Sequence, residues 1–326
     1  MQVIIPLAGK GTRLRPHTHL TPKPLLKVAG RPVMDWVMDR LEGLDIEELI
    51  FITGHLKEAV EQYATSRYPI PSRYVEQKVQ DGTAGAVNLA RPYVRGPVLI
   101  IFVDTVFEAD LTLINRTDAD GIIWAKEVED YQRFGVVVTD AAGYMTRIVE
   151  KPTEPISKLA NIGLYYIRDV EALWRGIDWT LSQPTNKGEY YLTDAFQHMI
   201  EHGKRILAAE VGGWYDCGEM GTFLESNEIL LKQGAARCPA VGPDVTVREP
   251  VLIEDGVVLE RCTVGPNVTI ETGTRIADST VEHALVGRNC RITNATLRQA
   301  MLGQHVTIDR FQGGATLGDH SEVRGA

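Results

Sequence analysis

The first residues that could do chemistry are cations that follow the first apolar run of the chain. In the stretch 3-VIIPLAGKGTRLRPHTHLTPKPLLKV-28, Arg13 follows a glycine-bearing turn and Lys23 lies between two prolines. Glycines allow a loop to present several backbone N–H groups to phosphate oxygens, and fixed cations offset the charge of such a ligand. Because the prolines stiffen the backbone at Lys23, ordinary solvated loop charge explains that lysine poorly. The stretch therefore predicts a binding site for a phosphorylated ligand.

The fragment GKGT is not a P-loop. A P-loop requires GxxxxGK[ST], but here Lys10 is followed by Gly11, and Ile4 stands six positions before Lys10. A dinucleotide-binding fingerprint requires GxGxxG, and the third glycine is replaced by Leu14. From these residues alone, a plain structural turn stays open as the alternative to a phosphate-binding loop.

Two aspartates stand where a carboxylate has little reason to pack. Asp104 ends the most apolar run of the chain, 98-VLIIFV-103, and Asp216 lies in the aromatic–glycine turn 214-WYDCG-218. Mg²⁺ typically takes one or two carboxylates together with substrate phosphates. Both aspartates are therefore candidate ligands of a metal, and the alternative for each is a strand-end cap or an ordinary loop residue.

The first two-thirds of the chain alternates apolar runs with helical patterns, which predicts a doubly wound α/β fold with a mostly parallel sheet. The expected buried strands are Val3–Leu7, Glu48–Thr53, Val98–Val103 and Gly121–Ala125. The expected helices are Val33–Leu41, Leu56–Tyr63 and Ala84–Ala90. Ligands of such sheets bind at the carboxyl ends of the strands, where the opening turn and Asp104 both fall.

From residue 241 onward the pattern changes to aliphatic residues about six positions apart. The series are Val264/Ile270/Ile276, Val286/Ile292, Leu302/Ile308 and Leu317/Val323, with turn residues between them. This spacing predicts a small parallel β-helix and not an amphipathic helix, which would need spacings of three or four. We expect the β-helix to be left-handed. The segment 311-FQGGA-315 reads as an insertion or a corner. We therefore expect domains at 1–236 and 240–326.

Composition narrows the class of protein further. The 326 residues carry a net charge of −9, which argues against nucleic acid or an anionic membrane as a partner. The longest apolar run is the length of a strand, far below the roughly 18–20 residues of a membrane span. The start of the chain has no secretory leader pattern, and the four cysteines form no CxxC motif. We expect a cytoplasmic protein with reduced thiols.

With these residues in view, AGKGTRLRP…PKPLL resembles the signature of sugar-1-phosphate nucleotidylyltransferases, LAGGxGTRLxPLT…xKPL. The resemblance continues in the same order across residues 3–230, and the family often carries a β-helix tail. The further segments that are similar to family motifs are 77-QKVQDGTAGAV-87, 103-VDT-105, 134-FGVV-137, 150-EKP-152, 161-NIG-163 and 214-WYDCG-218.

The resemblance implies a reaction in which a sugar 1-phosphate attacks a nucleoside triphosphate and expels pyrophosphate, with Mg²⁺ as cofactor. It implies catalytic roles for Arg13, Lys23 and Asp104, and metal ligation by Asp104 and Asp216. The implied nucleotide-binding residues are Leu7, Ala8, Gly9, Gly11, Thr12, Arg13, Gln77, Gly82 and Thr83. The implied sugar-phosphate-binding residues are Gly135, Glu150, Lys151 and Asn161.

The chain departs from the family pattern at several positions that bear on substrate choice. Ala8 replaces the first glycine of the usual pair, a form that resembles the uridylyltransferase branch, and Ile162 replaces the usual alanine. Val103 and Thr105 replace the usual Gly and Asn beside Asp104. These departures leave the reaction class in place and affect the expected base and sugar contacts.

Substrate identity and the role of the tail stay open at this point. Glucose 1-phosphate with dTTP or UTP is favoured; a mannose-1-phosphate guanylyltransferase, a bifunctional enzyme with an acyltransferase tail, and a non-catalytic sugar-nucleotide sensor are the alternatives. An acyltransferase would need a histidine such as His283, His305 or His320 on the β-helix. His17 and His19 are expected to face solvent. We expect a homo-oligomer, formed through the β-helix or the catalytic domain.

Overall fold

The computed structural model describes residues 1–325, which group into two compact units. The first unit comprises Met1–Lys10 and Val37–Trp214. The second unit comprises Gly11–Trp36 together with residue 215 onward. The opening stretch is therefore divided between them: its strand belongs to the first unit, while the segment with Arg13 and Lys23 belongs to the second.

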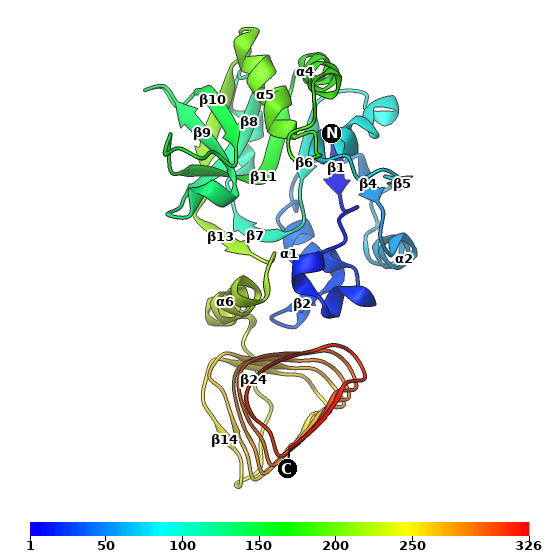
Figure 1. The fold of residues 1–326 in the computed structure, drawn as a ribbon, viewed down its shortest axis with the longest axis vertical. Helices are drawn as coiled ribbons and strands as arrows, with labels where there is room; N and C mark the ends of the chain where they lie inside the picture. The colour runs from blue at the N-terminus through cyan, green and yellow to red at the C-terminus, as the bar shows by residue number, and fades with distance from the viewer. Residues whose placement is uncertain (326) are drawn as a thin grey trace. The chain divides into compact units, whose positions relative to one another are not determined.

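The first unit is built on one nine-stranded mixed sheet with the order β10-β9-β11-β6-β1-β4-β5 (Figure 1). In addition, β8 pairs with β11, and β12 pairs with β8. The strands are β1 (Gln2–Pro6), β4 (Glu48–Thr53), β5 (Ser72–Glu76), β6 (Val98–Ile101), β8 (Gly121–Glu127), β9 (Gly135–Thr139), β10 (Met145–Glu150), β11 (Leu159–Ile167) and β12 (Ile206–Glu210). β6, β1, β4 and β5 pair in parallel, as the apolar runs predicted.

The other half of the sheet is organised by β11, which is antiparallel to β6, β8 and β9. β8, which corresponds to the predicted strand Gly121–Ala125, is parallel only to β12. The prediction that this strand pairs in parallel is thus correct for its pairing with β12 and wrong for its pairing with β11. Its residues are apolar because the strand is buried, and burial does not depend on the direction of a neighbouring strand.

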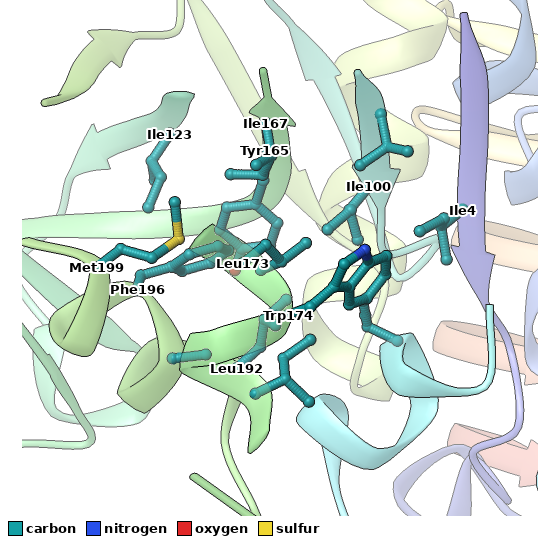
Figure 2. Close-up of a cluster of buried hydrophobic side chains, with 14 of the residues drawn as sticks. Ile4, Ile100, Ile123, Tyr165, Ile167, Leu173, Trp174, Leu192, Phe196 and Met199 are labelled. Carbon is teal, nitrogen blue, oxygen red and sulfur yellow. The ribbon is translucent and has the colours of Figure 1, made fainter. Parts of the chain in front are cut away.

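Helices cover this sheet and supply much of its core. They are α2 (Lys57–Arg67), α3 (Thr83–Asn88), α4 (Val170–Ser182) and α5 (Leu192–Glu201). The helix α1 (Val33–Asp39) is divided between the two units, and α1, α2 and α3 fall at the expected places. α4 begins at Asp169, whose Oδ1 accepts a hydrogen bond from the backbone N–H of Ala172 at 2.9 Å, as an N-cap residue does. Figure 2 shows Leu173 and Trp174 of α4 packed with Ile100 and Tyr165 of the sheet.

The second unit contains a parallel β-helix whose stacked coils have a triangular outline (Figure 1). Its strands are β14 (Thr246–Val247), β15 (Val251–Ile253), β16 (Val258–Glu260), β17 (Thr263–Val264), β18 (Val268–Ile270), β19 (Arg275–Ala277), β20 (Thr280–Val286), β21 (Arg291–Thr293), β22 (Thr296–Leu302), β23 (Thr307–Asp309), β24 (Gln312–Leu317) and β25 (Glu322–Arg324).

The aliphatic spacing read from the sequence is confirmed as the inward ladder of these coils. Ile276 pairs with Ile292, Ile292 with Ile308, and Ile308 with Val323. The segment 311-FQGGA-315 is a corner rather than an insertion. Leu297 pairs with Gly313 and Ala300 pairs with Ala315, so this coil is one residue shorter at the corner than the coil before it.

The second unit also holds α6 (Met220–Leu230) and a hairpin of β2 (Lys27–Val28) and β3 (Arg31–Pro32). The first unit holds β7 (Thr105–Glu108), and β13 spans Gly213–Asp216. All four cysteines are free thiols. Within residues 1–325, no helix combines the length and the apolar character that crossing a membrane requires.

Candidate active site

The glycine-bearing turn after β1 begins inside the first unit and is anchored there by its backbone. The N–H of Leu7 donates to the carbonyl of Ile52 at 2.7 Å, which extends the β1–β4 pairing by one residue. The side-chain amide of Gln80 donates to the carbonyl of Ala8 at 2.7 Å. Leu7 and Ala8 are buried, whereas Gly9 is exposed. The exposed part of the turn therefore starts at Gly9, as a loop that wraps a ligand would.

The segment expected to contact the base is ordered by its own polar groups. Gln77 is only 7% exposed, and its Nε2 donates to Asp81 Oδ1 at 3.0 Å and to the Gly82 carbonyl at 3.3 Å. Gly82 has a φ of 111°, and a Cβ there would lie 2.4 Å from the Tyr190 carbonyl oxygen. Only glycine fits this position. The Thr83 hydroxyl accepts a hydrogen bond from the N–H of Leu192 at 2.8 Å.

The four residues implied in sugar-phosphate binding include a tightly packed group on β9, β10 and β11. Asn161 Nδ2 donates to the Gly135 carbonyl at 2.9 Å. A Cβ at Gly135 would lie 2.3 Å from that Nδ2 and 2.9 Å from Glu150 Oε2. Lys151 Nζ lies 3.6 Å from Glu150 Oε1. Glycine at 135 therefore allows the amide and the carboxylate to approach the backbone closely.

Two residues of this group carry no family motif and were not predicted. The Tyr165 hydroxyl donates to Asn161 Oδ1, and the Thr193 hydroxyl donates to Glu150 Oε2 at 3.3 Å. In a regular strand a period of two would place residues 161, 163 and 165 on one face and so indicate Tyr165, but the register of β11 shifts between Asn161 and Tyr165. No comparable signal marks Thr193, which comes from α5. We call Gly135, Glu150, Asn161, Tyr165 and Thr193 the sugar-side cluster.

Burial dominates the electrostatics of this cluster. It raises the pKa of Glu150, and the nearby Lys151 ammonium opposes that rise. Burial also raises the pKa of the Tyr165 phenol well above its ordinary value, and the charges of Glu150 and Asp104 add to the effect. Tyr165 therefore stays a hydrogen-bond donor at neutral pH. Asp104, in the turn between β6 and β7, is near enough to this cluster to act on it electrostatically.

The predicted phosphate-binding cations lie in the second unit on short 3-10 turns. Gly11, with a φ of 59°, starts the turn Thr12–Leu14, and a Cβ there would lie 2.9 Å from Thr18 Cγ2 and 3.2 Å from Lys23 Cβ. Arg13 is 60% exposed and pairs with Glu219 at 2.9 Å. Lys23 begins the turn Lys23–Leu25, directly after Pro22. Close packing at Gly11 therefore fixes the two turns against each other.

Asp216 also belongs to the second unit and lies near Arg13. Its Oδ1 accepts the N–H of Gly218 at 2.8 Å, and the hydroxyl of Ser226 donates to its carbonyl at 2.9 Å. A Cβ at Gly218 would lie 2.8 Å from Asp216 Oδ1 and 3.6 Å from Arg13 Nη2. Of the predicted site residues, Gly11, Thr12, Arg13, Lys23 and Asp216 are thus in the second unit, and the rest are in the first.

One of the two histidines of the opening stretch differs from expectation. His17 is 7% exposed rather than solvent-facing, and its burial lowers its pKa, opposed by Asp319 and a backbone bond to Met301. It is buried because the segment packs on the β-helix of the same unit. His19 is exposed, as expected. Across residues 1–325, no three His, Cys, Asp or Glu side chains come together as a metal-binding group.

Comparison with known proteins assigns the class. Residues 2–233 match the family described as Nucleotidyl transferase, and the chain belongs to this family. It is 32% identical over 267 residues to "Bifunctional protein GlmU" of Methanococcus aeolicus, covering 80% of this chain and 62% of that protein. It is 33% identical over 221 residues to "UTP--glucose-1-phosphate uridylyltransferase AglF" of Haloferax volcanii, covering 66% of this chain and 89% of that one.

A solved structure gives the same fold for the first part of the chain. The crystal structure of a UDP-glucose pyrophosphorylase complexed with UDP-glucose superimposes with a TM-score of 0.65 at 24% identity, covering 71% of this chain and 98% of that chain. The chain thus spans nearly the whole of that structure, but only 62% of the length of the GlmU relative. The α/β fold of the family, followed by a parallel β-helix, is confirmed.

Proposed function

We propose that this protein joins a nucleoside triphosphate to a sugar 1-phosphate, giving a nucleotide sugar and pyrophosphate. The observation that carries the proposal is the sugar-side cluster beside Lys151. Buried amide, carboxylate, hydroxyl and phenol groups suit a polyhydroxylated ligand, and an adjacent ammonium suits its phosphate. Membership of the Nucleotidyl transferase family supports it independently.

The chemistry is an in-line displacement that demands charge compensation more than proton transfer. A phosphate oxygen of the sugar 1-phosphate attacks the α-phosphorus, a new P–O bond forms, and the bond to pyrophosphate breaks. Charge accumulates on the phosphoryl oxygens while two anions meet, so fixed cations stabilise the transition state. We assign this role to Arg13 and Lys23, with Lys151 holding the phosphate of the sugar and Glu150 accepting bonds from sugar hydroxyls.

The donor set fits Mg²⁺ as cofactor. Asp104 and Asp216 are single carboxylates in turns, and a magnesium ion bound by one or two carboxylates plus substrate phosphates needs no cluster of three protein ligands. When bound with the triphosphate, the ion would neutralise charge on the phosphate oxygens. Residues Leu7 to Thr12 would hold the triphosphate through backbone groups, while Gln77, Gly82 and Thr83 would contact the base.

We favour glucose 1-phosphate with UTP or dTTP, and the relative named as a UTP--glucose-1-phosphate uridylyltransferase supports the sugar phosphate and UTP. In domain terms, residues 1–236 would carry the catalysis and residues 240–326 the β-helix, in keeping with a family match that ends at residue 233. Association into a homo-oligomer, through either part, belongs to the same proposal.

One panel assay tests the proposal. Pyrophosphate release is measured with Mg²⁺ for UTP, dTTP, GTP and ATP, each crossed with glucose, mannose, galactose and N-acetylglucosamine 1-phosphate. The expected result is turnover that requires both substrates and is highest for UTP or dTTP with glucose 1-phosphate. Release that occurs without any sugar phosphate, or no release with any pair, would contradict it.

A further inference from the structure

The β-helix has one row of outward-pointing residues that is buried. Residues pointing outward from a β-helix alternate with the inward ladder, and in this row Leu252 pairs with Thr269, Thr269 with Leu285, and Leu285 with Met301. Thr269, Leu285 and Met301 are only 2%, 6% and 5% exposed. By contrast, Arg275 and Arg291, beside the inward ladder on β19 and β21, are exposed. We call Leu252, Thr269, Leu285 and Met301 the docking row.

The hairpin that follows Lys23 packs on the start of this row. A Cβ at Gly30, in the hairpin turn, would lie 2.9 Å from Leu252 Cδ1. The side chain of Lys27 lies 3.1 Å from Glu271 Oε2 and 3.7 Å from Glu254 Oε1, two residues of successive coils. The carboxylates of Glu254 and Glu271 are mostly buried, so this pairing is less screened than a surface ion pair.

Asn227 of α6 joins the hairpin to the docking row. It is fully buried, and its Oδ1 accepts the backbone N–H of Ala29 at 3.0 Å and the hydroxyl of Thr269 at 2.7 Å. Its Nδ2 donates to the carbonyl of Asn267 at 3.4 Å. One side chain therefore ties together the hairpin, α6 and the β-helix, and each group it pairs would be costly to leave unpaired.

The other end of the segment is held by later coils. A Cβ at Gly318 would lie 3.0 Å from Pro16, and the neighbouring His17 is only 7% exposed. Lys23 lies between this contact and the hairpin, and its carbonyl accepts the N–H of Leu26 at 3.2 Å. The backbone that carries Lys23 is thus fixed on the β-helix both before and after it.

We infer that the docking row and Asn227 position the phosphate-binding cations, so that the β-helix fixes the placement of Arg13 and Lys23. This inference rests on the proposed function, because it assigns Asn227, Thr269 and Lys27 as positioning residues that act through Arg13 and Lys23. In-line phosphoryl transfer is sensitive to such placement, since a displacement of about 1 Å can cost on the order of a hundredfold in rate.

The test compares two Thr→Val substitutions that each remove one hydroxyl bond from the β-helix. Thr269→Val removes the bond to Asn227, whereas the control Thr293→Val removes the bond of Thr293 to Asp309, which is 3.0 Å long. We expect Thr269→Val to lower kcat about tenfold, the equivalent of one hydrogen bond, and Thr293→Val to leave it within twofold. Amide hydrogen exchange in residues 20–32 should rise only in Thr269→Val.

Two further variants separate positioning from loss of structure. Asn227→Leu should lower kcat by on the order of a hundredfold. Lys27→Met should lower kcat less than Asn227→Leu does. Lys27→Arg should have a kcat close to that of the wild-type protein, because the charge is kept. Equal losses of kcat in Thr269→Val and Thr293→Val would overturn the inference, as would unchanged kcat and exchange in Thr269→Val. If the wild-type protein releases no pyrophosphate with any substrate pair, the proposed function fails instead, and the exchange comparison still decides whether the row holds the segment.

Discussion

The sugar-side cluster and the Arg13–Lys23 segment differ in both burial and local structure. The cluster lies on β9, β10 and β11 with help from α5, and its polar groups are buried and bonded to one another. The Arg13–Lys23 segment has only short 3-10 turns and is followed by a hairpin whose two strands are two residues long. The side chain of Arg13 is 60% exposed. Neutral hydroxyl recognition tolerates burial, whereas cations must keep most of their hydration until an anion arrives. The sheet holds the residues of the cluster in place. For the two cations, we infer that the β-helix provides this rigidity.

The largest loss of kcat is expected for substitution of Asp104, whose charge contributes to the raised pKa of Tyr165 in the sugar-side cluster. Asp104→Asn keeps the shape and removes the negative charge that would hold Mg²⁺, so kcat should fall roughly a thousandfold because the ion would no longer offset charge on the phosphoryl oxygens. Steady-state pyrophosphate release with Mg²⁺ measures it. Asp118→Asn, at an exposed side chain 3.5 Å from Arg205, is the matched control. Near-normal turnover of Asp104→Asn would remove this residue from the mechanism.

The two lysines of the opening stretch give the next contrast. Lys23→Met should lower kcat about a hundredfold, because a fixed cation near the reacting phosphates is lost. Lys10→Met should leave kcat within twofold, because Lys10 is exposed and stands at a variable position of the family signature. Measurement of kcat and KM for both variants decides the point. Similar losses in both would show that general positive charge, rather than placement of Lys23, matters.

Gly135→Ala is expected to disrupt the packing of the sugar-side cluster while leaving every polar side chain of the cluster unsubstituted. The new Cβ would lie 2.3 Å from Asn161 Nδ2, so the amide or the strand must move. We expect the free energy of unfolding to fall by about 2 kcal/mol, as for other overpacked sites. Chemical denaturation measures this change, with Gly9→Ala, at an exposed turn position, as the control. An unchanged midpoint would mean that the cluster yields more easily than its packing suggests.

The smallest effect concerns the pH dependence of sugar-phosphate binding. Burial raises the pKa of Glu150 above its ordinary value of 4.5, so its carboxylate is lost on acidification earlier than an exposed glutamate would be. Sugar hydroxyls bind the ionised form, so kcat/KM for the sugar phosphate should fall as pH drops through that raised pKa. Glu150→Gln should lower kcat/KM about tenfold at neutral pH, roughly one charged hydrogen bond, and abolish this step.

The substrate phosphate itself titrates near pH 6, so its own step should persist in Glu150→Gln. The difference between the two pH profiles therefore reports on Glu150 alone. Identical profiles for the wild-type and Glu150→Gln proteins would exclude a role for the carboxylate in binding.

Sequence reasoning was most successful where a local pattern decides the structure. Apolar runs predicted β1, β4 and β6, and the aliphatic spacing predicted the Ile276–Ile292–Ile308 ladder, because both signals are repeated within a few residues. The roles of the predicted site residues stay predictions that only the variants above can test.

What the sequence could not reveal depends on contacts between distant positions. Asn227 bonds to Ala29 and to Thr269, which are 198 and 42 residues away along the chain. Nothing in the residues around position 227 distinguishes that asparagine from a polar residue on the exposed side of a helix. The antiparallel placement of β11 was missed for a similar reason, because burial makes a strand apolar whatever the direction of its neighbours.

The split membership of the opening stretch has a consequence for the order of events during synthesis. The two strands that pair with β1, which are β4 and β6, both lie within the first 101 residues. The sheet can therefore begin to form before synthesis of the chain is complete. The residues after β1 wait for coils that emerge more than 200 positions later, such as the coil carrying Thr269. A nascent chain can thus acquire its sheet long before its cations are in place. On the proposed function, activity would therefore appear only after the β-helix has been synthesised.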